Sequence, residues 1–229
     1  MSVAQDLLKR LPDGVAPGWD LLVDGVLIPM REMSLIHPKF GEVRFGLSPA
    51  GKYGTWGFAE VGGGGAVDVP FFMHPELGLM VGLVQQPRPF MSTEPVWNLP
   101  RGFMDPGETH FESAVRELKE EVGAKGGKRV FLLDGDPVNP NSTFFVTVGK
   151  NDDGTDKGIR FYGVRFQPED FQPTSDGFVF KPGVVEPVSK AAEGIMKCRF
   201  IPWLGATNIG CLMTVGGICR LIAYLNSHP

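Results

Sequence analysis

Three glutamates near the middle of the chain have the spacing of a metal site. Glu117, Glu120 and Glu121 lie three and four residues apart, so in a helix they share one face. Like charges at that separation repel and destabilise a bare helix, whereas a hard divalent cation bound through carboxylate oxygens relieves the repulsion. The spacing therefore predicts a site for Mg²⁺, with Mn²⁺ as the alternative metal.

The other face of the same segment is apolar. Phe111, Ala114, Leu118 and Val122 recur close to the helical period. We therefore expect a helix over about 110–122 that docks its apolar face on a core and turns its acids outward.

The ends of this helix are also marked in the sequence. Thr109 and Glu112 have the spacing of a capping box, and the residues 105–107, Asp-Pro-Gly, predict a turn just before it. Gly123 is expected to end the helix, because glycine readily takes the left-handed conformation found there.

One cation lies among the acids. Arg116 is four residues after Glu112 and four before Glu120, where its planar guanidinium can orient a carboxylate. Glu108, ahead of the helix, either pairs with Arg116 or reaches the metal zone, and the sequence leaves both open.

The whole run resembles the Nudix box, the loop-helix-loop signature of the Nudix hydrolases. The matching positions are Gly102, Glu108, Arg116, Glu117, Leu118, Glu120, Glu121 and Gly123. Ala124 departs from the pattern, since a bulkier aliphatic residue is usual there. The resemblance implies an α/β fold, an α/β/α sandwich around a mixed β-sheet, and metal-dependent hydrolysis of phosphoanhydrides.

The resemblance also implies roles for individual residues. Glu117, Glu120 and Glu121 are the expected metal-binding acids, with the Gly102 carbonyl as a further ligand. Glu108 and Arg116 are expected to hold the loop and the helix in register.

Upstream of the box, the chain is similar to the Nudix branch that acts on ADP-ribose and nucleoside-diphosphate sugars. A buried strand over 79–86 is followed by Pro-Arg-Pro at 87–89, and residues 96–102 lead into the box. Asn98 stands where that branch usually has glutamate. Arg101, just before the box glycine, is also found in the dinucleoside-polyphosphate branch.

Four residues of this region are candidates for substrate binding. Arg88 and Arg101 could contact phosphates. Trp97 and Phe103 either stack on a base or pack against the protein, and the sequence favours packing.

An additional acid is expected in the proline-rich region 167–193, which we interpret as a long loop. In similar enzymes, a carboxylate just before a late strand serves as base or extra ligand. Glu193, directly ahead of Gly194, is the nearest match, and Glu186 is its rival. The alternative is that both are solvated loop acids.

These residues predict hydrolysis of ADP-ribose or a nucleotide sugar to a nucleoside monophosphate and a sugar phosphate. Glu117, Glu120 and Glu121 would hold the metal, and Glu193 or Glu120 would assist deprotonation of the attacking water. One alternative substrate is a dinucleoside polyphosphate or a nucleoside triphosphate. Another alternative is a nucleotide sensor that keeps the fold without turnover.

Composition narrows the class of partner. The formal net charge is −4 and no run of Lys or Arg occurs, which argues against broad nucleic-acid binding. The N-terminal segment lacks the apolar core of a secretion signal, and no apolar run approaches membrane-spanning length. We expect a cytoplasmic protein that binds a small nucleotide.

The chain contains 31 glycines and 20 prolines, which predicts many turns and short strands. We expect a small β-rich N-terminal unit over 1–65 and the Nudix domain over 66–229. By similarity to related enzymes, the N-terminal unit would pair two chains in a homodimer. Within 66–229, the expected strands are 66–73, 79–86, 129–133, 143–149, 159–166 and 195–203, and the expected closing helix is 212–225.

Overall fold

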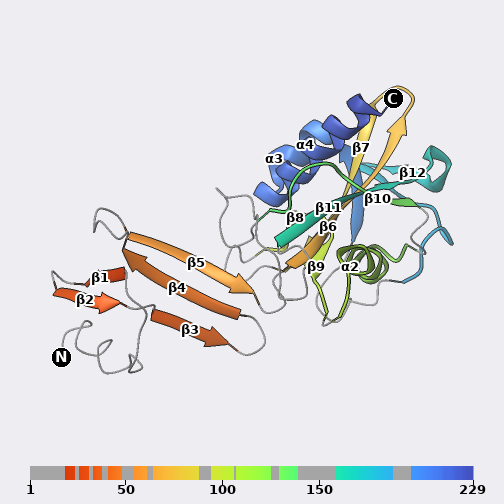
Figure 1. Cartoon of the computed structure of the whole chain (residues 1–229). Coiled ribbons are helices and arrows are strands. Elements are labelled where there is room, and N and C mark those ends of the chain that lie inside the picture. Colours follow the sequence, from red (N-terminus) through yellow and green to blue (C-terminus); the bar gives the residue numbers. More distant parts are fainter. Residues whose placement is uncertain are drawn as a thin grey trace. The chain divides into compact units, whose positions relative to one another are not determined.

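The computed structural model describes residues 64–87, 94–105, 107–124, 129–138, 158–187 and 197–228, and the backbone of five strands nearer the N-terminus. Figure 1 shows these elements along the chain. The chain forms two compact units, residues 1–63 with 140–144 and residues 64–139 with 145–229.

The N-terminal unit contains two antiparallel arrangements of strands. β1 (Trp19–Val23) pairs with β2 (Val26–Met30), and β4 (Gly41–Leu47) lies between β3 (Met33–His37) and β5 (Gly54–Glu60). The assignment of a β-rich N-terminal unit over 1–65 and a second domain over 66–229 stays a prediction.

The second unit is built on a mixed sheet, which is nine-stranded among the described residues. Its order is β10-β11-β6-β7-β14-β13-β12, with β8 added to β7 and β9 added to β6. β6 runs parallel to β11 and antiparallel to β7. The bounds are β6 Gly64–His74, β7 Gly78–Gln86, β8 Val96–Asn98, β9 Arg101–Phe103, β10 Val130–Leu132, β11 Gly158–Arg165, β12 Phe171–Thr174, β13 Gly177–Phe180 and β14 Cys198–Pro202.

Helices cover both faces of this sheet. On one face lie α2 (His110–Glu117) and the π-helical turn η1 (Leu118–Val122); on the other lie α3 (Trp203–Ile209) and α4 (Leu212–Ser227). A short 3₁₀ turn, η3 (Pro168–Asp170), precedes β12. Among the described residues, no helix is long and apolar enough to cross a membrane.

Alternation along β6 builds the two cores. Ala66 and Phe72 point to the side of α2 and join a buried cluster with Leu118, whereas Val67 and Phe71 join the cluster of α4 on the opposite side. A strand buried on both faces has no polar side to show, which explains its nearly continuous apolar sequence. The predicted α/β/α sandwich around a mixed sheet is confirmed.

The region 167–193 is not the uninterrupted loop that its prolines predicted. It contains η3 and the antiparallel hairpin of β12 and β13. Aromatic packing stabilises this hairpin: the Phe171 ring stacks on Phe72 with centroids 4.1 Å apart, and the Phe180 ring lies 4.9 Å from that of Phe171. The strand predicted over 143–149 lies outside the described residues.

Candidate functional site

The helix of the box begins and ends where the sequence predicts. The Thr109 side chain accepts a hydrogen bond from the Glu112 backbone N–H, and the Glu112 carboxylate accepts one from the Thr109 backbone N–H, which completes the capping box. Gly123 follows the last helical residue with a φ of 76°, the left-handed conformation expected for it.

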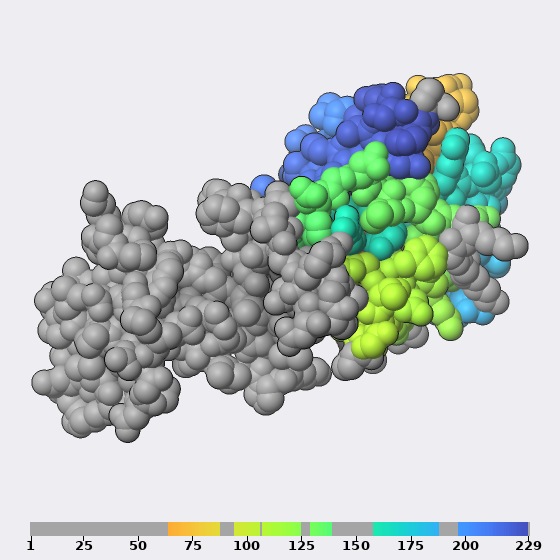
Figure 2. All heavy atoms as spheres, in the orientation of Figure 1, coloured from red at the N-terminus to blue at the C-terminus, as the bar shows by residue number. Residues whose placement is uncertain are grey.

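The orientation of the acids differs from the expectation. Glu117 and Glu121 are 2% and 4% exposed, so they face the protein rather than solvent, whereas Phe111 is 45% exposed. Residues 118–122 form a π-helical turn, which has a wider period than the α-helix assumed in the prediction. Ala114, Leu118 and Val122 are buried as predicted. In the space-filling view, the outer surface of the box segment appears in yellow-green, next to residues 129–138 in green (Figure 2).

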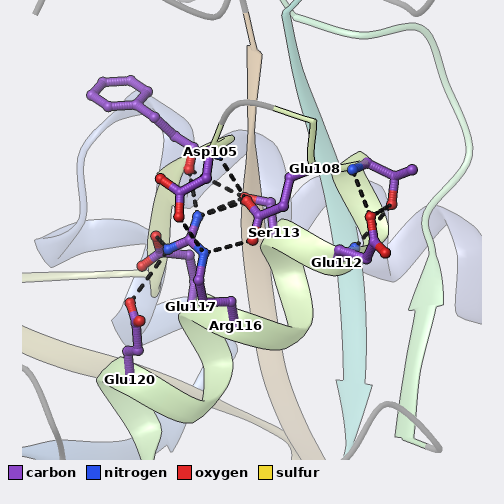
Figure 3. A network of polar contacts seen from close by, with 9 residues as sticks. Asp105, Glu108, Glu112, Ser113, Arg116, Glu117 and Glu120 are labelled. Atoms are coloured by element: carbon purple, nitrogen blue, oxygen red, sulfur yellow. Dashed lines mark hydrogen bonds and ion pairs between the residues drawn. The ribbon is translucent and has the colours of Figure 1, made fainter. Parts of the chain in front are cut away.

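Arg116 lies at the centre of a network of carboxylates (Figure 3). Its Nε and Nη2 donate to the two oxygens of Glu108 at 2.7 and 2.9 Å, a bidentate pairing. The pairing answers the question that the sequence left open, because Glu108 pairs with Arg116. The hydrogen bond from Arg116 lowers the pKa of Glu108 below its ordinary value.

The same guanidinium ties the preceding loop to the helix. Nη1 donates to Glu117 Oε1 at 2.5 Å and lies 3.3 Å from Glu120 Oε2, and Nη2 donates to the Phe103 carbonyl at 2.6 Å. Oxygens of Glu117 and Glu120 thus converge on one nitrogen. Hydrogen bonding, first of all with Glu108, raises the pKa of Arg116, which stays a cation.

Glu121 is held from the sheet side. Its Oε1 accepts a hydrogen bond from Gln86 Nε2 at 3.0 Å, and its Oε2 accepts one from the Arg101 backbone N–H at 3.0 Å. Gln86 ends β7 and Arg101 begins β9. The ends of two strands therefore fix the position of this buried carboxylate.

Gly102 is in close contact with Glu117. A Cβ atom at residue 102 would lie 1.8 Å from Glu117 Oε1, so no other residue type fits there without displacing the carboxylate. The Gly102 carbonyl lies against Gly65 of β6, where a Cβ atom would come within 2.5 Å of it. Its service as a metal ligand stays a prediction.

A further carboxylate lies beneath the helix, and the sequence reasoning missed it. Asp68 of β6 is 0% exposed, and its two side-chain oxygens have no hydrogen-bond partner among the described residues. Burial, then the charges of Glu117 and Glu121, raise the pKa of Asp68 well above its ordinary value. An aspartate within the apolar strand sequence of 66–73 was the signal that could have identified it.

Two buried polar residues on the strands before the box were also not assigned a role from the sequence. Gln86 contacts Glu121, as described above, and Asn98 is 2% exposed with a side-chain nitrogen that has no hydrogen-bond partner in the described part of the chain. Asn98 is the residue at which the upstream segment departs from the ADP-ribose branch. Within the described ranges, no three His, Cys, Asp or Glu side chains form a preassembled metal-ligand cluster.

The candidate substrate-binding residues are placed separately. Trp97 packs on the α4 side of the sheet, with the Arg199 guanidinium carbon 4.2 Å from its ring centroid, whereas Phe103 is 49% exposed. The Arg101 side chain donates to Cys211 Sγ at 3.7 Å. Arg88 lies outside the described residues.

The two candidate late acids have different outcomes. Glu193 lies outside the residues that the structure describes. Glu186 is exposed, and its backbone N–H donates to the Gly123 carbonyl at 2.8 Å. The segment of Glu186 therefore passes the exit of the box helix.

A hollow follows the outer side of the helix, beside the acids. Apolar, acidic and basic side chains line it: Phe111, Glu112, Val115, Arg116, Lys119 and Glu120. Of the acids that line this hollow, Glu120 is the one that we predicted to bind metal, and its side chain is 29% exposed.

Comparison with known proteins finds a family match over the segment that contains this site. Residues 66–178 match the model of the NUDIX domain. No curated protein matches the chain in sequence.

Similar solved structures include a C. elegans Ap4A hydrolase in a binary complex, which has 16% identity, a TM-score of 0.42, and coverage of 71% of this chain and 98% of that chain. An ADP compounds hydrolase has 15% identity and a TM-score of 0.46, and the match covers 94% of this chain and 98% of that chain. The NUDIX domain of Shewanella oneidensis NrtR, complexed with ADP ribose, has 18% identity, a TM-score of 0.41, and coverage of 72% and 90%.

Proposed function

Because residues 66–178 of the chain match the model of the NUDIX domain, we propose that the protein is a metal-dependent pyrophosphohydrolase. Its proposed substrate is a nucleoside diphosphate joined to another moiety, either ADP-ribose or a nucleotide sugar. The products are a nucleoside monophosphate and a sugar phosphate. The observation that carries the proposal is the pair of buried acids, Glu117 and Glu121, held against the backbone of residues 101–102.

The donors present fit a hard divalent cation. Glu117, Glu120 and Glu121 offer carboxylate oxygens, and Mg²⁺ and Mn²⁺ prefer oxygen ligands. Buried acids are costly to keep charged unless a cation compensates them, and Asp68 oxygens without hydrogen-bond partners among the described residues add to that cost. We propose that the three glutamates hold the metal, with the Gly102 carbonyl as a further ligand.

Diphosphate hydrolysis depends mainly on positioning and charge compensation. When bound, Mg²⁺ supplies positive charge to the phosphoryl oxygens and lowers the pKa of water. Glu108 holds Arg116 through two hydrogen bonds, so Arg116 can keep the loop on the helix while Glu117 and Glu120 exchange their contacts with the arginine for contacts with the metal. Glu120, which is partly exposed, or Glu193 is the proposed general base.

The upstream segment supports the choice of substrate class. Residues 96–102 and the Pro-Arg-Pro at 87–89 are similar to the sugar-diphosphate branch, and we propose Arg88 and Arg101 as phosphate contacts. Phe103 is exposed enough to stack on a base, whereas Trp97 already packs on the protein.

The test is a substrate panel in the presence of Mg²⁺, with products separated by chromatography. The panel contains ADP-ribose, nucleotide sugars, diadenosine polyphosphates and nucleoside triphosphates. Preference for ADP-ribose or one nucleotide sugar supports the proposal, and preference for polyphosphates assigns the chain to the other branch. Absence of turnover in folded protein with either Mg²⁺ or Mn²⁺ would instead favour a nucleotide sensor.

Glu120→Gln is the sharper test of the acids. Glu121 accepts two hydrogen bonds from fixed donors, so its replacement by glutamine also disturbs the fold, whereas Glu120 is partly exposed. We expect Glu120→Gln to lower turnover by at least about 100-fold. Glu76→Gln, at an exposed residue of the turn between β6 and β7, is the matched control and should retain activity. Equal activity of the two variants contradicts the assignment of Glu120.

The N-terminal unit is proposed to pair two chains, as in similar sugar-diphosphate enzymes. Light scattering on the full chain measures the mass directly. A dimer supports the proposal, and a monomer at the concentrations used for catalysis contradicts it.

A further inference from the structure

Asp68 occupies a position where an apolar side chain would stabilise the fold better. It is fully buried, and neither of its side-chain oxygens has a hydrogen-bond partner among the described residues. A buried polar group without a partner destabilises the folded state, and a buried unpaired charge does so more strongly. Its neighbours on the strand, Val67 and Val69, show that this part of β6 otherwise carries apolar residues.

Strand alternation directs Asp68 toward the box helix. Ala66 and Phe72 have the same parity along β6 and pack in the cluster of Leu118 and Val122. Odd-numbered residues, such as Val67, pack in the opposite cluster. Asp68 therefore lies on the sheet face that η1 covers, beneath the acids rather than beside them.

One short segment connects Asp68 to the acids of the helix. The Asp68 backbone N–H donates to the Pro100 carbonyl at 2.9 Å, and the next residue, Arg101, donates its own N–H to Glu121. The residue after that, Gly102, packs against the Glu117 carboxylate. Residues 100–102 thus contact both buried glutamates and the backbone of Asp68.

The electrostatics agree with this placement. The negative charges of Glu117 and Glu121 act on the Asp68 carboxyl strongly enough to add to the effect of its burial. In the described part of the chain, no cationic side chain forms a salt bridge with Asp68, whereas Arg116 pairs with Glu108, Glu117 and Glu120. A cation between the helix and the sheet would compensate all three buried carboxylates at once.

We propose that Asp68 is a fourth carboxylate of the metal centre, which donates an oxygen ligand from the sheet side beneath Glu117 and Glu121. The inference rests on the proposed function, because it concerns the same metal centre. It assigns a ligand that lies outside the box and 49 residues before Glu117 in sequence, where the box motif gives no indication of it.

The test measures metal binding in the absence of substrate. Mn²⁺ is titrated into wild-type protein and Asp68→Asn, and free Mn²⁺ is followed by electron paramagnetic resonance. Asparagine keeps the shape and removes the charge, so we expect the Kd for Mn²⁺ to rise about 10- to 100-fold. Asp134→Asn removes a carboxylate charge at an exposed position outside the site, and its Kd should stay within about twofold of wild type.

Thermal unfolding separates a ligand from a structural residue. Without metal, Asp68→Asn should unfold at the wild-type temperature or above it, because the mutation removes a buried carboxyl group that is costly to ionise. The increase in Tm on adding Mn²⁺ should shrink. If Asp68→Asn shows no native circular dichroism, Asp68→Ser replaces it in the same titration.

The outcomes distinguish this inference from the proposed function. An unchanged Kd in folded Asp68→Asn overturns the role of Asp68, while wild-type binding and the loss of binding in Glu120→Gln still support the metal centre. If wild-type protein binds no Mn²⁺ at millimolar concentration, both the metal centre and the role of Asp68 are overturned.

Discussion

Gly102→Ala is the substitution for which the structure gives the most specific expectation. The added Cβ atom would lie 1.8 Å from Oε1 of Glu117, 2.1 Å from its Cδ and 2.7 Å from its Oε2. All three separations are below the 3.0 Å that real Cβ atoms keep, so rotation of the carboxylate about its own bond cannot relieve the contact. The Glu117 carboxylate must move as a whole, by roughly 1 Å or more.

Two effects follow from this displacement. Forcing a methyl group into a filled interior typically costs about 1–3 kcal/mol, so the free energy of unfolding should fall by that amount. A misplacement of about 1 Å in a catalytic group can cost about 100-fold in rate, so turnover should fall by roughly that factor in protein that is still folded.

The assay compares Gly102→Ala with Gly216→Ala, which makes the same chemical change in α4. At residue 216, the nearest atom to the added Cβ is Phe161 Cζ, 3.9 Å away, which is an ordinary contact. This control should keep full turnover and gain up to about 1 kcal/mol from helix propensity. Turnover is measured with the preferred substrate of the panel, and stability by urea unfolding. Wild-type turnover in Gly102→Ala would refute the reasoning, because it would mean that catalysis does not depend on where the Glu117 carboxylate lies.

Two further predictions concern the loop and helix start. Thr109→Ala removes the acceptor of the Glu112 N–H at the helix N-terminus and should lower the free energy of unfolding by about 1 kcal/mol, as measured by the urea midpoint. Glu108→Gln loses the charged bidentate pairing with Arg116 and should lower the free energy of unfolding by about 1 kcal/mol at pH 7. This value is in the lower part of the range for charged hydrogen bonds, because solvent screens the pair. Since the pKa of Glu108 is lowered in the folded state, this stabilisation is present above its unfolded pKa of about 4.3 and is lost as the pH falls through the lower folded value. Urea unfolding from pH 7 to pH 3 should show the wild-type advantage disappearing in acid, and a constant difference would contradict this origin.

The helix of the box could be predicted from the sequence, because the residues that start and end a helix lie within a few positions of its ends. Thr109 and Glu112 form the capping box, and Gly123 takes the left-handed conformation, as their positions in sequence require. The hairpin of β6 and β7 was predicted for the same reason, since a short turn over 75–77 separates two apolar runs.

Burial of the acids could not be predicted, because it depends on strands that are distant in sequence. Glu121 is held by Gln86 of β7, 35 residues earlier, and a helical period alone places the acids without saying what they face. The hairpin of β12 and β13 was missed for a related reason. Its stability comes from contacts of Phe171 and Phe180 with Phe200 of β14, whereas the intervening prolines suggested a loop.

The function of Arg116 follows from the asymmetry of its contacts. On one side, it makes two hydrogen bonds to Glu108, with the geometry of a stable fork; on the other, it makes single contacts with Glu117 and Glu120. Carboxylates on single contacts exchange partners more readily than a bidentate pair. If the acids hold a metal as proposed, the arginine can compensate them before the metal binds and release them to it without leaving the loop. Glu108 would then serve the site indirectly, because its two hydrogen bonds keep the guanidinium anchored.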